Sequence, residues 1–205
     1  MTKQVFISGF LISLLFSNFL ALASDKYDYG AGIRIGEQTG LSIQKYINRR
    51  TIEFLITSSI QKDESAYYKR WDNYCKDRYP FASKFEYLDY GSTPRISIHS
   101  HYKGKTRIPE IKNLHLYYGI GIQIRYHVYY YDFKYMLYDE TEWKYSDKKT
   151  IPDIDIGPDW LFGFDYKIPE TRFIVYVEFN VFWEFINHPS VWSQPGFGVN
   201  YLFNY

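Results

Sequence analysis

The chain has 205 residues and one cysteine, and its 24 Lys and Arg against 23 Asp and Glu give a formal net charge of +1. This length suits one domain, the near-neutral charge argues against a nucleic-acid-binding protein, and the aromatic content of 21% argues against disorder. A mean hydropathy of −0.38 excludes a bundle of membrane helices, but it is compatible with a membrane β-barrel, in which half of each strand is polar.

Residues 1–23 have the composition of a secretory signal peptide. Lys3 precedes an apolar run over 5–20, and Ala21-Leu22-Ala23 fits the small-x-small pattern of a cleavage site. We therefore expect removal of 1–23, with 24–205 forming the mature domain. The alternative is an uncleaved membrane anchor, because the run approaches the length of a membrane-spanning helix. Polar residues within the run and the lack of a basic stop-transfer segment favour cleavage.

From residue 24 onward, apolar side chains alternate with polar or small ones, which is the period of a β-strand and not of a helix. In 114–125, for example, Leu, Tyr or Ile stands at every even position. We predict eight strands, most of them close to the roughly 9–11 residues that a tilted strand needs to cross a bilayer. They cover 29–35, 41–47, 51–60, 96–102, 114–125, 156–166, 173–185 and 197–205.

The two faces of these strands differ in a way that favours a membrane. The apolar faces are bulky and end in Tyr or Trp, whereas the polar faces are rich in Gly, hydroxyls and isolated charges. Lipid outside and a polar lumen inside explain both features. The alternative, a soluble barrel that binds an apolar ligand, requires inward-pointing side chains at Ile33, Phe54, Ile122 and Phe162.

The predicted connections alternate between short and long. Short links lie at 48–50, 108–110 and 169–171, while long charged links run over 61–95 and 129–153. The link over 187–194 is intermediate, and the first link, 37–40, is an exception because it is short where a longer loop is expected. Short turns on one side and long loops on the other are typical of up-and-down outer-membrane barrels. This arrangement leaves both chain ends on the side of the short turns.

Three passages resemble the small barrel proteins of Bacteroidetes and spirochaetes: 32–36 with 39–42, then 117–121, then the C-terminal strand. The whole mature chain is similar to the eight-stranded outer-membrane barrels of the OmpA transmembrane domain and OmpX type. The resemblance implies an all-β, eight-stranded antiparallel up-and-down transmembrane β-barrel in the bacterial outer membrane, with extracellular loops and periplasmic termini. It also implies a signal for the barrel-assembly machinery, formed by Val199, Tyr201, Phe203 and Tyr205.

An eight-stranded barrel is just wide enough for side chains to fill. The residues predicted to form a polar network in the lumen are Arg34, Glu53, His99, His101, Arg125, Asp159, Asp165, Glu178 and Glu184, with His115 on the same face. Buried charges must pair or be hydrated, so we expect ion pairs around Arg34 and Arg125. Glycines at 30, 32, 196 and 198 are expected to leave space for long side chains from the opposite wall. The alternative is a narrow, acid-lined ion path.

Both long links are rich in aromatic residues, which are enriched at interfaces. We predict that they bind an extracellular ligand, with contacts from Trp71, Tyr74, Tyr79, Tyr135, Tyr138 and Trp143. In the alternative, these aromatics belong to interfacial girdles and to strand extensions packed over the barrel mouth. Tyr129-Tyr130-Tyr131, which directly follows a predicted strand, favours the alternative.

No catalytic signature, cofactor motif or metal motif is evident. The chain lacks Gly-x-Ser-x-Gly and His-Glu-x-x-His. Ser97 and His99 lie about 7 Å apart along a strand, too far for a direct hydrogen bond without favourable rotamers. His99 and His101 could face a metal, but lumenal histidines in a polar network are commoner. We therefore expect a non-enzymatic envelope structural or surface-interaction protein with outer-membrane lipid as its surroundings; the alternative is a lipid-modifying acyl transferase or deacylase.

Overall fold

The computed structural model describes residues 27–59, 64–186 and 189–204. The predicted signal peptide, 1–23, lies outside these residues. The described chain contains ten strands and the helix α2 (Glu64–Arg78). The strands are β1 (Tyr29–Gly36), β2 (Thr39–Ile47), β3 (Arg50–Ser59), β4 (Ala82–Ser92), β5 (Arg95–Arg107), β6 (Leu114–Leu137), β7 (Lys144–Tyr145), β8 (Lys149–Lys167), β9 (Phe173–Glu184) and β10 (Ser190–Phe203).

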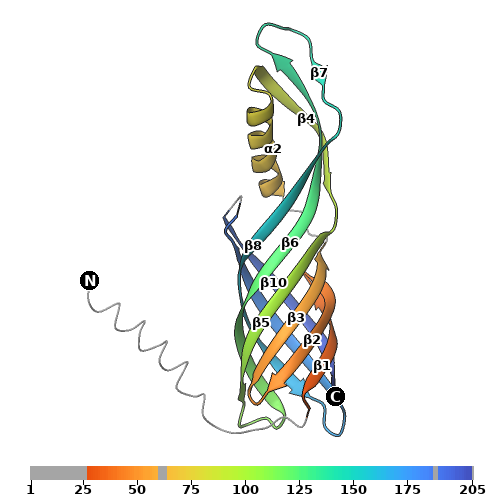
Figure 1. Cartoon of the computed structure of the whole chain (residues 1–205), viewed down its shortest axis with the longest axis vertical. Helices are drawn as coiled ribbons and strands as arrows, with labels where there is room; N and C mark the ends of the chain where they lie inside the picture. The colour runs from red at the N-terminus through yellow and green to blue at the C-terminus, as the bar shows by residue number, and fades with distance from the viewer. Residues whose placement is uncertain (1–26, 60–63, 187–188, 205) are drawn as a thin grey trace, which may run out of the picture.

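Eight of the strands close into a barrel (Figure 1). Each barrel strand pairs antiparallel with the next one along the chain, apart from the excursions of β4 and β7. β10 then pairs with β1, with Phe203 opposite Tyr29 and Gly196 opposite Gly36. The predicted fold, an eight-stranded antiparallel up-and-down transmembrane β-barrel, is confirmed.

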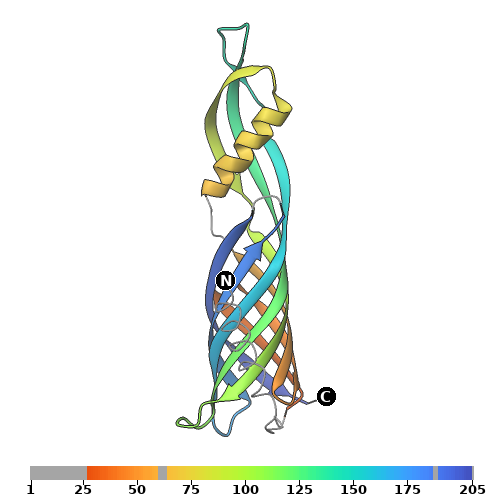
Figure 2. The ribbon, with the colours of Figure 1, turned by 90° about the vertical axis from the view of Figure 1, so that its left-hand side faces the viewer.

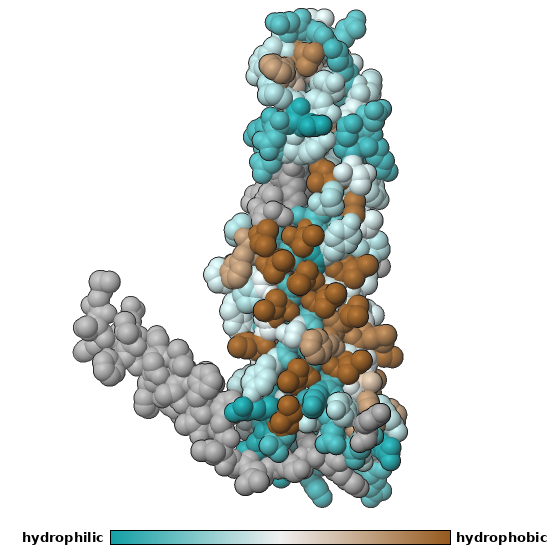
Figure 3. Space-filling view, in the orientation of Figure 1, coloured by the Kyte–Doolittle hydropathy of each residue, from teal (hydrophilic) through white to brown (hydrophobic). Residues whose placement is uncertain are grey.

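The outer surface of the barrel is apolar, as the alternation predicts. Ile33, Phe54, Ile122 and Phe162 are between 49% and 59% exposed, and exposed apolar side chains occur on all eight barrel strands. On the face seen in Figure 3 they form a broad band across the barrel. A soluble barrel with an apolar interior is therefore wrong for this chain. Apolar side chains in such a band face lipid.

If the apolar band faces lipid, a charged residue introduced into it should lower the free energy of unfolding more than one introduced into a turn. Ile122 lies at the middle of the outward row of β6 and is 59% exposed. Ile122→Arg should lower the free energy of unfolding by about 2–4 kcal/mol, because an arginine at the bilayer midplane loses its hydration. Ile111→Arg is the matched control, since Ile111 is 50% exposed but lies in the turn between β5 and β6. Urea unfolding in lipid vesicles measures both, and equal costs would contradict this placement of the membrane.

The connections between β2 and β3, β5 and β6, and β8 and β9 lie at one end of the barrel, together with both ends of the described chain (Figure 1). The two-residue link between β1 and β2 lies at the other end. Asn48, Asn113 and Glu170, in the three turns beside the chain ends, have φ values of 57°, 68° and 62°. The left-handed backbone conformation is tolerated by Asn better than by most residues, so Asn48 and Asn113 suit their turns.

At the other end the barrel continues into a folded extension, which comprises α2, β4, β7 and the adjoining parts of β6 (129–137) and β8 (149–153). β4 pairs with β6 from Ser92 opposite Tyr129 to Ala82 opposite Leu137, while β8 follows β6 as far as Tyr131 opposite Lys149. α2 packs across one face of this ribbon (Figure 2). The prediction that 61–95 and 129–153 are loops, and that the mature chain has no helix, is therefore wrong.

Both faces of β6 change character where the extension begins. The lumenal face carries Arg125 and His127 and then turns aromatic with Tyr129, Tyr131 and Phe133, all of which are at most 2% exposed. The outward face changes the other way, from isoleucines to Asp132 and Lys134. A barrel in lipid is apolar outside, whereas a fold in water buries its apolar face. The inversion therefore marks the membrane surface near residues 127–129.

The extension has a core of its own, formed by Cys75, Tyr129, Tyr131 and Phe133 with partly buried neighbours on α2 and β4. Its rings pack edge to face, with Trp71 at 4.9 Å from Tyr87 between ring centroids and Tyr79 at 5.5 Å from Phe133. Tyr129, Tyr130 and Tyr131 thus belong to an extension of β6 beyond the barrel, as the alternative to a ligand-binding loop predicts. Within the described residues, no helix combines the length and the apolar character needed to cross a membrane.

Candidate functional site

The barrel lumen is lined by charged side chains from six of the eight barrel strands, while β2 and β10 contribute neutral polar side chains such as Gln44 and Asn200. The structure places all nine residues of the predicted polar network there, each at most 8% exposed. With their partners they form five groups along the barrel axis, and each group pairs cations or histidines with carboxylates. Pairing of this kind is what buried charges require.

Arg34 on β1 holds the wall between β1 and β10. Its Nε lies 2.8 Å from Glu178 Oε1, and its two terminal nitrogens donate to the carbonyl oxygens of Gln38 (3.2 Å) and Gln194 (2.8 Å). The planar guanidinium provides donors in several directions at once, which a lysine cannot. Arg34 thus ties β1 to β9 and β10.

The space beside the glycines on β1 and β10 is filled by other side chains than predicted. A Cβ on Gly196 would lie 2.8 Å from the Arg34 guanidinium, and one on Gly198 would lie 2.5 Å from the Tyr176 ring. Both side chains come from adjacent strands, because Arg34 is on β1 and Tyr176 is on β9. The glycines therefore make room for neighbours in the same wall, and the expectation that they face the opposite wall is wrong.

Lys103 on β5 joins two carboxylates in the middle of the lumen. Its Nζ lies 2.7 Å from Glu53 Oε2 and 3.7 Å from Glu178 Oε2. Tyr117 also donates to Glu178, at 3.0 Å, and Gln44 donates to Glu53. Lys103 is therefore a centre of the network beside Arg34.

Above Lys103, two histidines share one carboxylate. His101 Nε2 and His99 Nδ1 lie 2.9 and 3.1 Å from Asp159 Oδ2. The other nitrogen of His101 faces Glu53 at 2.8 Å, and that of His99 faces the Thr57 hydroxyl at 3.1 Å. Because each ring nitrogen has a polar partner, both imidazoles are held in a fixed orientation.

At the end nearest the extension, Arg125 is enclosed by acids and aromatic rings. One of its terminal nitrogens lies 3.1 Å from Asp155 and 3.0 Å from Glu184, and the guanidinium stacks on Phe182 and Trp192 with distances of 4.2 and 4.7 Å. Ion pairing and cation–π contact together stabilise a buried guanidinium. This group closes the lumen beneath the extension.

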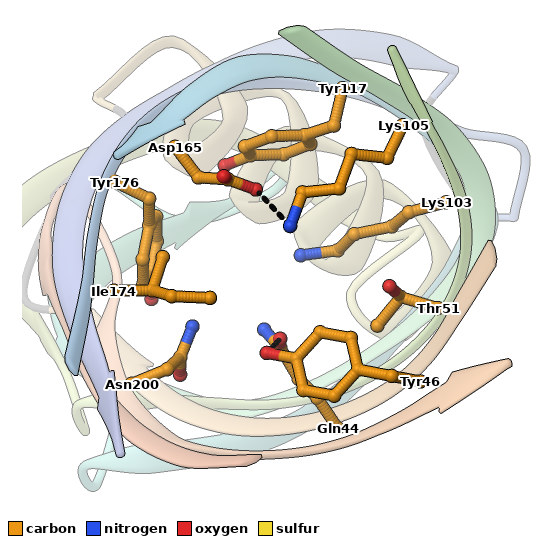
Figure 4. Close-up of a pocket in the computed structure, with 10 residues that line it drawn as sticks. All are labelled: Gln44, Tyr46, Thr51, Lys103, Lys105, Tyr117, Asp165, Ile174, Tyr176 and Asn200. Carbon is orange, nitrogen blue, oxygen red and sulfur yellow. Dashed lines mark hydrogen bonds and ion pairs between the residues drawn. The ribbon is translucent and has the colours of Figure 1, made fainter. Parts of the chain in front are cut away.

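The end with the short turns is closed by Lys105, Asp165 and His115. Lys105 lies 3.1 Å and His115 2.9 Å from the Asp165 carboxylate. Figure 4 shows the ion pair between Lys105 and Asp165. The cavity beside it measures about 20 Å³, which is room for about one water molecule. Side chains therefore fill the lumen at this level, and no pore is evident there.

Several members of the network were missed from the sequence. Lys103 and Lys105 continue the inward face of β5 beyond Tyr102, where the predicted strand ended, and Asp155 and Asp153 continue that of β8 before Ile156. The alternation of polar and apolar residues itself continues through these positions. On β5, however, Lys103-Gly104-Lys105 has the composition of a turn, which ends the strand predicted from sequence.

The barrel is closed, its lumen is filled by side chains and its exterior is apolar. This is the fold of the small outer-membrane β-barrels. Similar solved structures include the N-terminal β-barrel domain of Pseudomonas aeruginosa OprF, at 10% identity and a TM-score of 0.47, with 85% of this chain and 95% of that chain covered. Neisserial surface protein A is 10% identical, with a TM-score of 0.44 and with 85% of this chain and 93% of that chain covered. Ail of Yersinia pestis is 9% identical, with a TM-score of 0.45 and with 85% of this chain and 93% of that chain covered. No family model matches the sequence, nor does any curated protein.

The six aromatic residues predicted to bind a ligand are mostly engaged within the extension. Trp71, Tyr74, Tyr79 and Tyr135 pack against its buried core, and Lys134 lies over the Trp143 ring at 4.8 Å. Tyr138, which is 72% exposed, remains open. Other exposed apolar residues of the extension were not predicted; they are Phe81, Leu88 and Tyr145.

The residues considered for catalysis are not arranged for it. Ser97 is 1% exposed, and its hydroxyl lies 3.5 Å from the Gln38 amide. His99, the base considered for it, faces Thr57 and Asp159. A nucleophile needs a base within hydrogen-bond reach and access to substrate, and neither condition is met at Ser97 by the contacts of the described residues.

Cys75 in the extension should be unreactive while the protein is folded. Burial raises the pKa of its thiol to about 12, and the Asp72 carboxylate adds to the shift. Since the thiolate is the nucleophile, only about one thiol in 10,000 is ionised at pH 8. Iodoacetamide at pH 8 should therefore label native protein very slowly and boiled protein rapidly, as mass spectrometry measures. Rapid labelling of the native protein would contradict the packing of α2.

Proposed function

We propose that the chain is an integral outer-membrane protein whose plugged barrel holds the extension at the cell surface for contact with an extracellular partner. The observation that carries this proposal is the length of two barrel strands. β6 has 24 residues and β8 has 19, about twice the 9–11 that cross a bilayer. They run without a break from an ion-paired barrel into a folded extension, which is a rigid way of presenting a surface.

The tip of the extension suits contact with another molecule. Phe81 and Tyr138 are 77% and 72% exposed, and the Tyr138 amide donates to the Phe81 carbonyl at 3.2 Å, so the two lie on adjacent backbone. Exposed aromatic rings give large contact area with few rotatable bonds. The partner surface is accordingly narrower than the six aromatics predicted from sequence, and Tyr138 is the one residue common to both sets.

In this proposal the extension is extracellular and the short turns and termini are periplasmic. Val199, Tyr201 and Phe203 point outward from β10 beside β1, where the barrel-assembly machinery can contact them; Tyr205, the fourth predicted member of that signal, lies outside the described residues. The filled lumen supports a structural and not a conducting role, and the buried Ser97 supports a non-enzymatic one.

Orientation is tested with single cysteines in a Cys75→Ser background. Tyr138→Cys places a thiol at the tip of the extension, and Lys112→Cys places one in an exposed turn at the opposite end. A membrane-impermeant maleimide on intact cells should label Tyr138→Cys, and should label Lys112→Cys only after permeabilisation. Labelling of Lys112→Cys on intact cells would contradict the proposed orientation.

Contact and conduction are tested separately. A photo-reactive residue at position 138 should give covalent adducts on cells, and one at position 112 serves as the matched control; no adduct from 138 would contradict the contact role.

Purified protein in a planar bilayer should give no steady conductance. A steady conductance that Arg125→Ala abolishes would instead assign an ion path to the lumen.

A further inference from the structure

His99, His101 and Asp159 converge inside the barrel from strands that are distant in sequence. Asp159 Oδ2 lies 3.1 Å from His99 Nδ1 and 2.9 Å from His101 Nε2, and all three side chains are at most 1% exposed. One ligand atom from each residue lies within 4.8 Å of the others. No metal site is predicted from the sequence, because alternation alone does not bring Asp159 to the two histidines.

We propose that His99, His101 and Asp159 bind one divalent transition-metal ion of the zinc class in the centre of the lumen. Two imidazole nitrogens and one carboxylate oxygen form a donor set typical of zinc sites with a fourth, open position. Nitrogen-rich donor sets of this kind select zinc and its neighbours over magnesium or calcium. The proposal is independent of the proposed surface role.

The surroundings of the two histidines match those of metal ligands. A metal-bound histidine normally donates its second ring N–H to a carboxylate or another acceptor, which fixes the tautomer. Here the second nitrogen of His101 faces Glu53 Oε2 at 2.8 Å, and the second nitrogen of His99 faces Thr57 Oγ1 at 3.1 Å. With these acceptors in place for the second ring N–H, the two nitrogens that face Asp159 are the ones that would coordinate a metal once it displaces their protons.

The two nitrogen-to-oxygen spacings are close to those of a tetrahedral site. Zinc bonds of about 2.0–2.1 Å at tetrahedral angles place neighbouring donors about 3.3 Å apart. The two nitrogen-to-oxygen distances of 3.1 and 2.9 Å reach that value with shifts of a few tenths of an ångström. A metal ion can therefore replace the protons between these groups without a change of fold.

Unused polar atoms at the site supply further donors. Asp159 Oδ1 is buried and has no hydrogen-bond partner among the described residues, and the same is true of Gln123 Oε1 and Nε2. Gln123 stands opposite His99 in the β5–β6 register and is 0% exposed. A buried polar atom without a partner is costly, and coordination of an ion would satisfy Asp159 Oδ1.

Gly121 is what allows the site to form. It lies between the two halves of the site, since it pairs with His101 on β5 and with Asp159 on β8. A Cβ there would lie 2.4 Å from His101 Cδ2, so any larger residue would displace the imidazole. The glycine lets His101 reach across one strand to the carboxylate.

A second group, His127 with Asp153 and Asp155, has similar spacing but is a weaker candidate. Asp155 is already paired with Arg125 at 3.1 Å, and that cation disfavours a second one nearby. His127 therefore provides a matched control: a buried lumenal histidine beside a carboxylate, outside the proposed site.

The test uses the full chain refolded in detergent micelles, with Co²⁺ as the probe and Zn²⁺ as the competitor. We expect one Co²⁺ per chain with the intense visible absorption of a tetrahedral ion, displaced by Zn²⁺. His101→Gln and Asp159→Asn should lower the affinity more than 100-fold, and Glu53→Gln about 10–100-fold as an orienting residue. His127→Gln should leave binding unchanged.

Folding of each variant is checked by its heat-dependent mobility on a gel, and Co²⁺ is supplied both during and after refolding so that access to the lumen does not limit binding. Wild-type protein that shows no tetrahedral absorption overturns the proposal, whatever the variants do. So does tetrahedral binding that survives Asp159→Asn or is lost equally in His127→Gln.

Discussion

Arg34→Ala should lower the free energy of unfolding by about 3–5 kcal/mol, the usual cost of removing one partner of a buried ion pair. Arg34 is 0% exposed and makes three hydrogen bonds, to Glu178 and to the backbone of Gln38 and Gln194. Its loss leaves Glu178 in the lumen without its shortest cation contact, and the nearest remaining one is Lys103 at 3.7 Å. Urea titration of the refolded protein, followed by cold and boiled electrophoresis, measures the change.

Two further variants serve as controls for Arg34→Ala. Arg172→Ala removes a guanidinium from an exposed turn, where it makes a long hydrogen bond of 3.4 Å to the Tyr201 hydroxyl. It should leave stability nearly unchanged, because exposed charged side chains contribute little. Arg34→Lys keeps the charge but not the three-directional donors, so we expect a loss between those of the other two variants. If Arg34→Ala and Arg172→Ala were equally stable, the lumenal network would not hold the barrel together.

Phe133→Ala should unfold the extension and leave the barrel intact. Phe133 is 0% exposed and contacts Trp71, Tyr79 and Phe85 through ring-to-ring distances of 5.5–6.4 Å. Removal of a buried phenylalanine side chain costs about 3–5 kcal/mol, which is large for a unit with one helix and a short ribbon. We expect rapid proteolysis within α2 and β4, and an unchanged heat-dependent shift of the barrel.

The matched control for this prediction is Tyr138→Ala. Tyr138 is an aromatic residue of the same extension but is 72% exposed, so its removal should leave the rate of proteolysis unchanged. Slow proteolysis of Phe133→Ala would contradict the independent core of the extension. Loss of the heat-dependent shift would contradict the separation of the extension from the barrel.

The sequence was sufficient to predict the barrel where lipid surrounds it. In β6 the alternation of Ile122 and Ile124 with Gln123 and Arg125 assigns both the strand and its two faces. The strand continues through Tyr129 with the polarity of its faces inverted, so a search for apolar residues on the lipid side ends too early. The physical cause is the change of solvent from lipid to water, which single-residue patterns do not reveal.

The helix and the pairings needed the structure. Trp71, Tyr74 and Cys75 have helical spacing, but α2 is so rich in charge and tyrosine that this stripe is hard to recognise. Alternation was sufficient to predict which side chains face the lumen, but not which of these side chains contact one another. Asp159 meets His99 and His101 across 60 and 58 positions, and this contact depends on strand register and on the gap at Gly121.

The central claim, a transmembrane barrel in the outer membrane, is tested most directly by cold and boiled electrophoresis of the outer-membrane fraction. We predict that the protein is found in this fraction and migrates differently before and after boiling, because a closed barrel resists SDS until it is heated. A protein that shows no shift and is released into a soluble periplasmic extract would contradict the account, since its apolar band could not then face lipid.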